Sequence, residues 1–442
     1  MGNRDIKPQS NDRRRFLGTA AKTALAAGAL HGFSTRLLAQ LSTAVKGVAR
    51  EKPEDVARDE SFWSFVRQGF SIDSRYIALN AGANNTSPRN ALEALLRNIE
   101  VVNAAPLTNQ RDFLQPQVET VRARLATMVN CSPEEIALTR NTTEALSTVI
   151  FGLDLKAGDE VLTTNQDYPS MLNALRQRAS RDGIHLNAIS IPTPSKAPAD
   201  LADAIERAIT GRTRVILVSH IVDSTGQILP VRSIAATARA RGIRLIVDGA
   251  LSFGTIPVDL QEMGCDYYGT SLHKGLHAPL GTGFLYVKRE HVRNLWPLFP
   301  SATPRSEDIR KFESIGTHPM YQIAAINQAI DFHETIGTER KRARLHYLKR
   351  CWADTLTPLS KIRLHTALDS EQSCGIANVE IEGIDPKMLY RFLLEKHRFQ
   401  VWPIEHAEYR GLWVSPFPYT SVDEVGRFAD AMSQIARKGL PE

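Results

Sequence analysis

The chain has 442 residues, enough for two or three domains that share a substantial core. Its composition, with 43% hydrophobic and 23% charged residues, excludes a largely disordered or collagen-like protein. The formal net charge is +6, but the first 40 residues hold seven Lys or Arg and two Asp, so the rest of the chain is nearly neutral and nucleic-acid binding is not indicated.

The N-terminal segment has the features of an export signal in the correct order. Residues 12–18 read Asp-Arg-Arg-Arg-Phe-Leu-Gly, and a weakly apolar run follows over residues 19–30. This arrangement resembles a bacterial twin-arginine signal, and the run is shorter than the roughly 20 apolar residues of a membrane span. We expect residues 1–44 to be a signal peptide read by the twin-arginine translocase, which predicts a periplasmic protein with no stable membrane span. A disordered basic tail is the alternative.

Residues 45–75 are predicted to be an N-terminal arm of short helices, and strand signals alternate with helix signals over residues 76–320. Helices are expected at 89–103, 114–129, 143–151, 169–181, 199–209 and 231–241. Strands are expected at 136–138, 160–163, 184–191, 215–218, 245–247 and 283–287. Short apolar strands that alternate with helices indicate an α/β domain with a mainly parallel sheet covered on both faces.

The pattern changes after residue 320. A long helical stretch over about 321–356 precedes a strand at 374–381, a helix at 386–396, strands at 401–402 and 413–415, and a final helix at 421–437. This order predicts a smaller α+β domain over residues 321–442. The four cysteines are widely spaced without a C-x-x-C motif, and a helix that would carry His273 and His277 is disfavoured by Gly275 and Pro279, so no metal site is predicted.

An aspartate and a lysine mark the chemical centre. Asp248 ends the strand predicted at 245–247, and Lys274 follows 26 residues later in a glycine-rich loop, next to His273. Ligands of α/β sheets bind beyond the carboxyl ends of the strands. A lysine of lowered pKa forms Schiff bases, and a carboxylate can keep the ring nitrogen of a pyridine cofactor protonated. Either residue alone would be a common structural feature.

Further motifs around this pair occur in a characteristic order. They lie at residues 138–146, 166–170, 219–220, 225–227, 247–250, 270–274 and 315–319. With them the sequence resembles the class V branch of fold-type I pyridoxal-phosphate enzymes, and within it the isopenicillin N epimerase-like group, over most of residues 75–435. The resemblance implies a mainly parallel seven-stranded sheet in the large domain, pyridoxal 5′-phosphate (PLP) as cofactor, a small-molecule amine as substrate and a homodimer.

The resemblance also implies a role for each matching residue that would hold the cofactor. Lys274 would bind PLP covalently and move a proton, and Asp248 would pair with the pyridine nitrogen. The N-terminus of the helix predicted at 143–151 would favour the phosphate. Phosphate contacts are implied for Thr142, Thr143, Ser271 and His273.

Other roles concern the ring, the substrate and the partner subunit. Tyr168 would stack on the cofactor ring. Gly316 and Thr317 would reach the cofactor of the neighbouring subunit. Asn84 and Trp413 are expected to contact the substrate.

Four positions depart from the family pattern. Leu251 and Gly275 stand where relatives usually have His and Trp, and Asp223 stands at the position of an Asn that binds the pyridine hydroxyl. Trp413 aligns with an Arg that clamps the substrate carboxylate, and an indole cannot supply the two-pronged contact of a guanidinium. These departures leave the lysine chemistry intact and point to a differently held amine, such as the terminus of a peptide-like metabolite.

The leading hypothesis is an exported PLP-dependent aminotransferase that acts on an amino-acid-like or peptide-like metabolite, for example in siderophore tailoring. Epimerisation, C–S cleavage and oxidative decarboxylation are alternatives on the same site. A desulfurase would need a mobile thiol, and Cys374 is instead predicted to be a core residue on a strand. A non-catalytic binding protein on a degenerate PLP fold is a further alternative.

Overall fold

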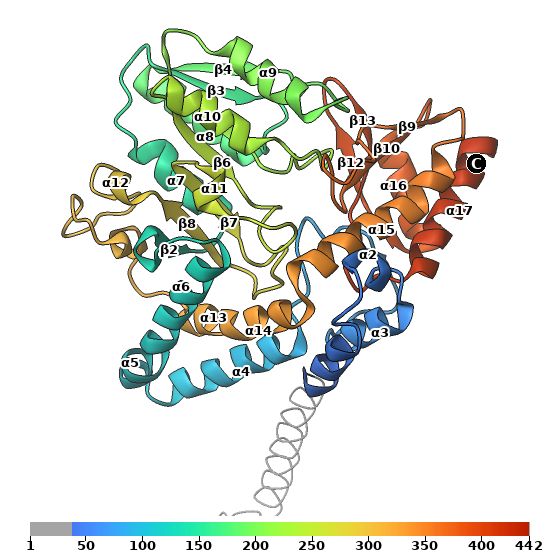
Figure 1. Ribbon diagram of the computed structural model, residues 1–442, viewed down its shortest axis with the longest axis horizontal. Helices are drawn as coiled ribbons and strands as arrows, with labels where there is room; N and C mark the ends of the chain where they lie inside the picture. The colour runs from blue at the N-terminus through green and yellow to red at the C-terminus, as the bar shows by residue number, and fades with distance from the viewer. Residues whose placement is uncertain (1–37, 442) are drawn as a thin grey trace, which may run out of the picture.

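The computed structural model describes residues 38–441, and its larger part is built on a seven-stranded sheet (Figure 1). The strand order is β2-β8-β7-β6-β5-β3-β4, in which β8 is antiparallel to both neighbours and the other adjacent strands are parallel. The strands are β2 (Ile136–Thr139), β3 (Glu160–Thr164), β4 (His185–Ile189), β5 (Thr213–Ser219), β6 (Arg244–Asp248), β7 (Tyr267–Ser271) and β8 (Gly283–Val287). The predicted α/β fold with a mainly parallel seven-stranded sheet is confirmed.

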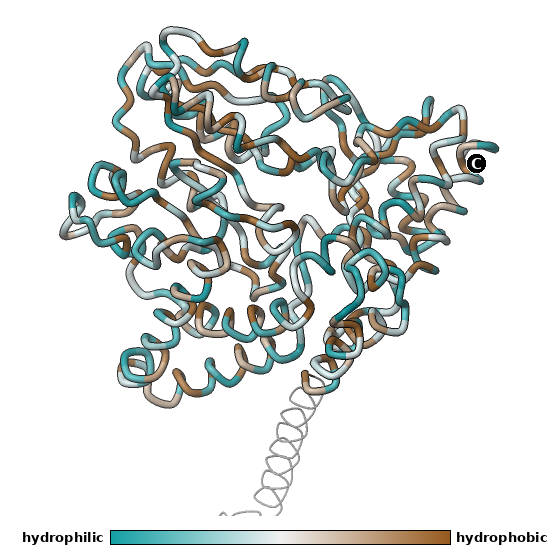
Figure 2. The backbone as a smooth tube through the Cα atoms, in the orientation of Figure 1, coloured by the Kyte–Doolittle hydropathy of each residue, from teal (hydrophilic) through white to brown (hydrophobic). Residues whose placement is uncertain are grey.

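Both faces of this sheet are buried. Successive side chains of β5 alternate between the faces: Ile216 and Val218 join one core with helices α6, α9, α10 and α14, and Val215 and Leu217 join the other core with α7 and α8. Each fully buried aliphatic side chain contributes about 1.5–3 kcal/mol. Figure 2 shows the resulting hydrophobic strands in the middle of the body. The covering helices are α6 (Gln115–Met128), α7 (Thr142–Gly152), α8 (Pro169–Asp182), α9 (Pro198–Ala208), α10 (Val231–Ala240) and α14 (Ile326–Ile336).

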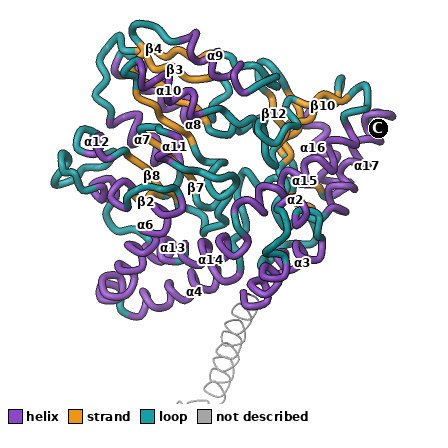
Figure 3. Tube along the Cα trace, in the orientation of Figure 1, coloured by secondary structure: helices purple, strands orange, loops and turns teal. Residues whose placement is uncertain are grey.

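A smaller antiparallel sheet with the order β12-β13-β10-β9 lies beside the large one (Figure 3). It shares a hydrophobic core with three helices. The strands are β9 (Ile362–Leu364), β10 (Ala377–Ile381), β12 (Trp402–Glu405) and β13 (Arg410–Val414), and the helices are α15 (Thr338–Leu356), α16 (Pro386–His397) and α17 (Val422–Lys438). Two short strands, β1 (Ile77–Ala78) and β11 (Phe399–Gln400), pair in parallel and connect the start of the fold to this unit.

The remaining helices are short or peripheral. In the arm, α2 (Pro53–Val56) and α3 (Glu60–Gln68) agree with the short helices predicted there. The others are α4 (Arg89–Ala104), α5 (Pro106–Asn109), α11 (Leu260–Met263), α12 (Arg289–Val292) and α13 (Met320–Ala324), with single turns at Gln110–Leu114, Pro133–Glu135 and Ile309–Glu313.

Several elements differ from the predictions, and strands β1, β9 and β11 are among those that were not predicted. The helical stretch over residues 321–356 is three helices, because the chain turns at Ala325 and again at Gly337, whose φ of +90° favours glycine. Strand β7 was not predicted, because its sequence Tyr-Tyr-Gly-Thr-Ser lacks the run of aliphatic residues that marks the neighbouring strands.

The predicted signal peptide falls almost wholly within residues 1–37, which lie outside the described part of the chain. Within residues 38–441, no helix combines the length and apolarity needed to cross a bilayer. The domain boundaries at residues 44, 75 and 320 stay predictions. Helices α13 and α14 follow the last of these boundaries and lie against α4 and α6 of the larger unit.

Candidate active site

A cavity of about 750 Å³ opens at the carboxyl edge of the large sheet, where the small unit faces it. It is the place that the topology of an α/β sheet favours for a ligand. Ten of the predicted site residues line it: Asn84, Thr142, Thr143, Tyr168, Asp223, Asp248, Ser271, His273, Lys274 and Trp413. Gly316 and Thr317 do not line it and are exposed, so their predicted contact with a partner's cofactor stays a prediction.

Lys274 lies on the turn that follows β7, and its ammonium group faces the Tyr168 ring at 5.7 Å from the ring centroid. Tyr168 is the residue before α8 and is 40% exposed, which leaves one side of its ring open to the cavity. A ligand ring between the aromatic face and the lysine would be covered on one side and reachable by the amine. This placement agrees with the predicted roles of both residues.

Asp248 is the last residue of β6 and is 5% exposed. Its carboxylate accepts a hydrogen bond of 2.9 Å from the Ala250 amide. Burial raises the pKa of Asp248 to about 6, with smaller contributions from the Ala250 hydrogen bond and Lys274, which lower it. A buried carboxylate of this kind gains most from a cationic partner, and a protonated pyridine nitrogen is such a partner.

The N-terminus of α7 forms an anion site beside Ser271. The Thr142 amide donates to Ser271 Oγ at 3.0 Å, and the two hydroxyl groups lie 2.8 Å apart. Asn141 caps the helix by accepting from the Glu144 amide at 2.9 Å. Amide groups at a helix start and the helix dipole both favour a phosphate at this position.

Two residues to which sequence reasoning assigned no role hold the site together. The buried Asp167 accepts bonds of 2.7 Å from both the amide and the hydroxyl of Ser219, and one of 2.9 Å from the Thr164 amide, so it ties the ends of β3 and β5 next to Tyr168. Asn85 donates from Nδ2 to the Lys274 carbonyl at 2.6 Å. The sequence signal for Asp167 was an aspartate three residues after the end of β3, and the signal for Asn85 was the Asn-rich run at 80–85.

The small unit lines the cavity with Trp413, which was predicted, and with residues that were not predicted. Trp402, Glu405 and His406 line the cavity from β12 and the residue after it. Glu405 is paired with Lys387 of α16, and the His406 ring stacks on Tyr409 at 4.5 Å between centroids. The cavity is thus enclosed by aromatic side chains from both units.

The four positions that were expected to depart from the family pattern have three kinds of surroundings. Trp413 and Leu251 are buried together in one apolar cluster, and the indole N–H of Trp413 has no hydrogen-bond partner. Asp223 is partly buried, and burial raises its pKa while Lys274 opposes the shift. Gly275 leaves no room for a side chain, because a Cβ there would overlap Phe253 O and Thr255.

These residues fit pyridoxal phosphate. Lys274 offers an amine, Asp248 a buried carboxylate, α7 with Ser271 a phosphate site, and Tyr168 an open aromatic face, all on one cavity. The amine suits the aldehyde of this cofactor, and the carboxylate suits its pyridine nitrogen. The helix N-terminus suits its phosphate, and the aromatic face suits its ring.

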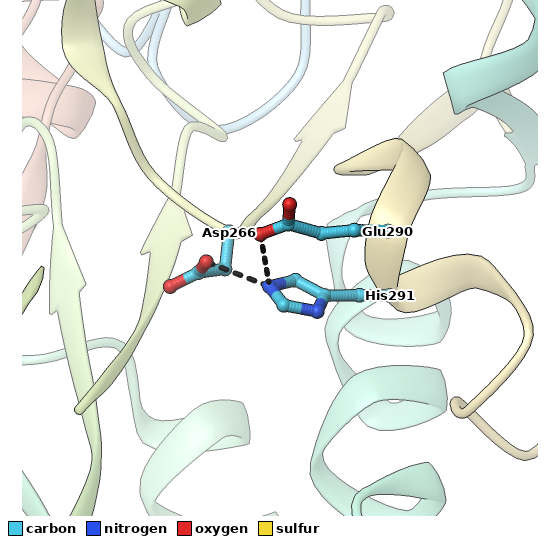
Figure 4. Close-up of side chains that lie close together, drawn as sticks. All are labelled: Asp266, Glu290 and His291. Atoms are coloured by element: carbon cyan, nitrogen blue, oxygen red, sulfur yellow. Dashed lines mark hydrogen bonds and ion pairs between the residues drawn. The ribbon is translucent and has the colours of Figure 1, made fainter. Parts of the chain in front are cut away.

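One group of potential metal ligands occurs in residues 38–441, at the opposite edge of the sheet (Figure 4). His291 Nε2 lies 2.8 Å from Asp266 and 3.6 Å from Glu290. Glu290 is also paired with Lys288 at 2.9 Å, and Asp266 accepts from the Leu245 amide at 2.7 Å. The three side chains form an ion-pair network in which each is already engaged.

The chain is similar to isopenicillin N epimerases and to cysteine desulfurases. The chain is 31% identical to isopenicillin N epimerase of Streptomyces clavuligerus over 394 residues, which covers 84% of this chain and 98% of that protein. The corresponding enzyme of Amycolatopsis lactamdurans is 29% identical and covers 85% of this chain and 99% of its own length. A probable cysteine desulfurase of Synechocystis sp. is 30% identical and covers 62% of this chain and 70% of its own length.

Solved structures show the same fold. A C-DES mutant with glycine covalently linked to its PLP cofactor has a TM-score of 0.73 at 24% identity and covers 83% of this chain and 98% of its own. A cysteine desulfurase from Escherichia coli has a TM-score of 0.76 at 20% identity, with coverage of 86% and 99%. The family model of aminotransferase class-V matches residues 77–401. The chain therefore belongs to the class-V aminotransferase family of PLP-dependent enzymes.

Proposed function

We propose that this enzyme removes a proton from the carbon that bears the amino group of an amino-acid-like or peptide-like metabolite, and that the reaction is a transamination. The observation that carries the proposal is the convergence of Lys274 and Asp248 on one cavity with the phosphate site of α7. A fold kept only for binding has no use for this pair, which speaks against the non-catalytic alternative.

Each residue has a defined task in this proposal. Lys274 would hold PLP through its amine, and the same amine would take the proton from the substrate carbon once the substrate has displaced it. Asp248 keeps the pyridine nitrogen protonated, and Tyr168 covers the ring. When bound, PLP supplies a ring that takes up electron density from the substrate carbon.

Epimerisation is the second candidate. It needs an acid on the side of the substrate opposite the base, and Tyr168 faces Lys274 across the cavity. Two isopenicillin N epimerases match the chain along nearly their whole length at 31% and 29% identity, whereas a probable cysteine desulfurase that matches over a similar length is 24% identical. C–S cleavage by a thiol has less support, because Cys374 does not line the cavity and burial raises the pKa of its thiol.

The substrate, the compartment and the assembly are part of the same proposal. The aromatic side chains that line the cavity suit a peptide-like amine such as a siderophore precursor better than a small amino acid. We propose that the mature enzyme acts in the periplasm after twin-arginine export, because the N-terminal segment contains the motif Arg-Arg-Arg-Phe-Leu. The exposed Gly316 and Thr317 support a homodimer in which this loop reaches the partner's cavity.

The absorbance spectrum before and after borohydride tests the proposal, with Lys274→Ala as the comparison. The wild type is expected to bind PLP with a visible band that borohydride fixes on the peptide containing Lys274, and the variant is expected to lack the fixed adduct. Formation of a carbonyl product from an amine then supports transamination, whereas solvent deuterium at an inverted centre without net product supports epimerisation. A wild type that stays colourless with added PLP overturns the proposal.

A further inference from the structure

The backbone of the Lys274 turn is held from outside at three successive carbonyl groups. His273 O accepts from the Asn85 amide at 3.1 Å, and Lys274 O accepts from Asn85 Nδ2 at 2.6 Å. Gly275 O accepts from Lys341 Nζ at 2.5 Å. One donor residue comes from the segment before α4 and the other from α15, so neither is close to the turn in sequence.

Lys341 is a buried amine with a second partner. It is 2% exposed, and its Nζ lies 2.9 Å from Nδ1 of His333, whose Nε2 lies 2.9 Å from the Thr338 hydroxyl. Burial lowers the pKa of Lys341 to about 7. The other titratable groups that face it are His277 and Cys374. A buried lysine is costly to keep, and here its hydrogen bonds go to the turn and to one histidine.

On the side away from Lys341, the turn that carries Lys274 packs tightly against the backbone near Gly254. A Cβ at Gly275 would overlap Phe253 O and the Thr255 hydroxyl, so the peptide at residue 275 is confined between the Gly254 turn and Lys341. Helix α15 runs along the small unit (Figure 1). It is anchored there because its Leu348 and Trp352 lie in the hydrophobic core of that unit. The position of the Lys274 backbone is therefore set jointly by both units.

We propose that Lys341 is a positioning residue for Lys274: by binding Gly275 O it fixes the turn so that the Lys274 amine points into the cavity at the cofactor. Lys341 touches neither substrate nor PLP in this assignment. The inference rests on the proposed role of Lys274, and it adds that the reactivity of this amine depends on a residue 67 positions further along the chain.

Helix α15 supplies a matched control. Lys349 is equally buried, with 0% of its surface exposed, and burial lowers its pKa to about 8. Its Nζ binds Ser373 Oγ instead of the turn that carries Lys274. Replacing either lysine by Met removes one buried amine from the same helix, so the two variants differ chiefly in the contact with Gly275.

The test is the rate at which PLP, added to the cofactor-free protein, becomes fixable by borohydride on Lys274, followed by absorbance and peptide mass. It is run well below the thermal midpoint of every variant. We expect Lys341→Met to be at least tenfold slower than the wild type and Lys349→Met to stay within twofold. The apparent pKa of the cofactor band should also move by at least half a unit in Lys341→Met and stay unchanged in Lys349→Met.

Equal rates and equal band titrations in the two variants overturn the positioning role and leave the proposed function standing. A wild type that fixes no PLP on Lys274 overturns the proposed function itself. If Lys341→Met does not fold, Asn85→Ala removes the donor to the adjacent carbonyl, and a rate at least fivefold below the wild type is expected. An unchanged rate in Asn85→Ala then overturns the proposal.

Discussion

The indole ring of Trp413 packs against Gly82 so closely that a Cβ on residue 82 would overlap ring atoms Cζ2 and Cη2. Gly82 belongs to the loop before α4 and Trp413 to β13, and both line the cavity. The absence of a side chain at residue 82 is therefore what leaves room for the Trp413 ring in the wall of the cavity.

The variant Gly82→Ala is expected to displace Trp413 and to destabilise the protein by about 1–3 kcal/mol, the usual cost of overpacking a rigid contact. Thermal or urea unfolding measures the loss. Gly426→Ala in α17 is the control, because a Cβ there meets nothing within 4 Å, and it should stabilise the helix by about 0.5–1 kcal/mol. Equal effects of the two substitutions would argue against the contact.

Amines without a carboxylate should react faster than the matching amino acids. Among the described residues that line the cavity, Lys274 is the single Lys or Arg side chain. Four lining residues are acidic: Asp167, Asp223, Asp248 and Glu405. A substrate carboxylate near these groups is repelled. We expect L-alaninamide to shift the cofactor band at least tenfold faster than L-alanine, in stopped-flow absorbance. A faster reaction with L-alanine would contradict this charge argument.

Replacing Tyr168 by Phe separates the two candidate reactions. The ring that faces Lys274 is kept, and only the hydroxyl is lost. If the reaction is the proposed transamination, carbonyl product should form within about threefold of the wild-type rate. A general acid contributes roughly 10²–10⁴-fold, so a larger loss, confined to inversion of the substrate centre, would identify Tyr168 as the acid of an epimerase.

The stability of the cofactor-free protein should depend on Asp248 between about pH 4 and pH 6. The pKa of Asp248 is raised to about 6 in the folded state, so the folded protein binds a proton that the unfolded chain has already released. The free energy of unfolding therefore falls as pH rises through this range, by up to about 1.4 kcal/mol per pH unit.

Urea unfolding of Asp248→Asn should lack this part of the pH dependence. The exposed Asp203 on α9 offers a control, since Asp203→Asn is expected to follow the wild-type curve. Parallel curves for the wild type and Asp248→Asn would show that the carboxyl titrates as it does in water.

Export should depend on the paired arginines. Replacing Arg13 and Arg14 by Lys keeps the charge of the N-terminal segment but removes the guanidinium pair, and the precursor is expected to accumulate in the cytoplasm. Fractionation with an activity or antibody assay measures this. A wild-type protein found wholly in the cytoplasm would contradict the proposal of export.

Local patterns predicted most regular elements, and for a simple reason. The strand expected at 283–287 is β8, and the helix expected at 89–103 is α4 with one more residue, because their apolar periodicity is a property of a few adjacent residues. Strand β7 was not predicted, because its burial on both faces comes from the surrounding strands and not from its own composition. The turn at Gly337 was not predicted, because a single glycine in a helical pattern does not show whether its φ is positive.

The types and order of the residues were enough to identify the family and to predict Lys274, Asp248 and a phosphate-binding helix, because the chemistry of this family needs an amine, a carboxylate and an anion site. The surroundings of those groups were decided by packing. Asn85 and Lys341 meet the Lys274 turn, Trp413 rests on Gly82, and Asp248 is buried deeply enough to raise its pKa to about 6. Each of these relations joins segments far apart in sequence, and such contacts arise only when the two units close around the cavity.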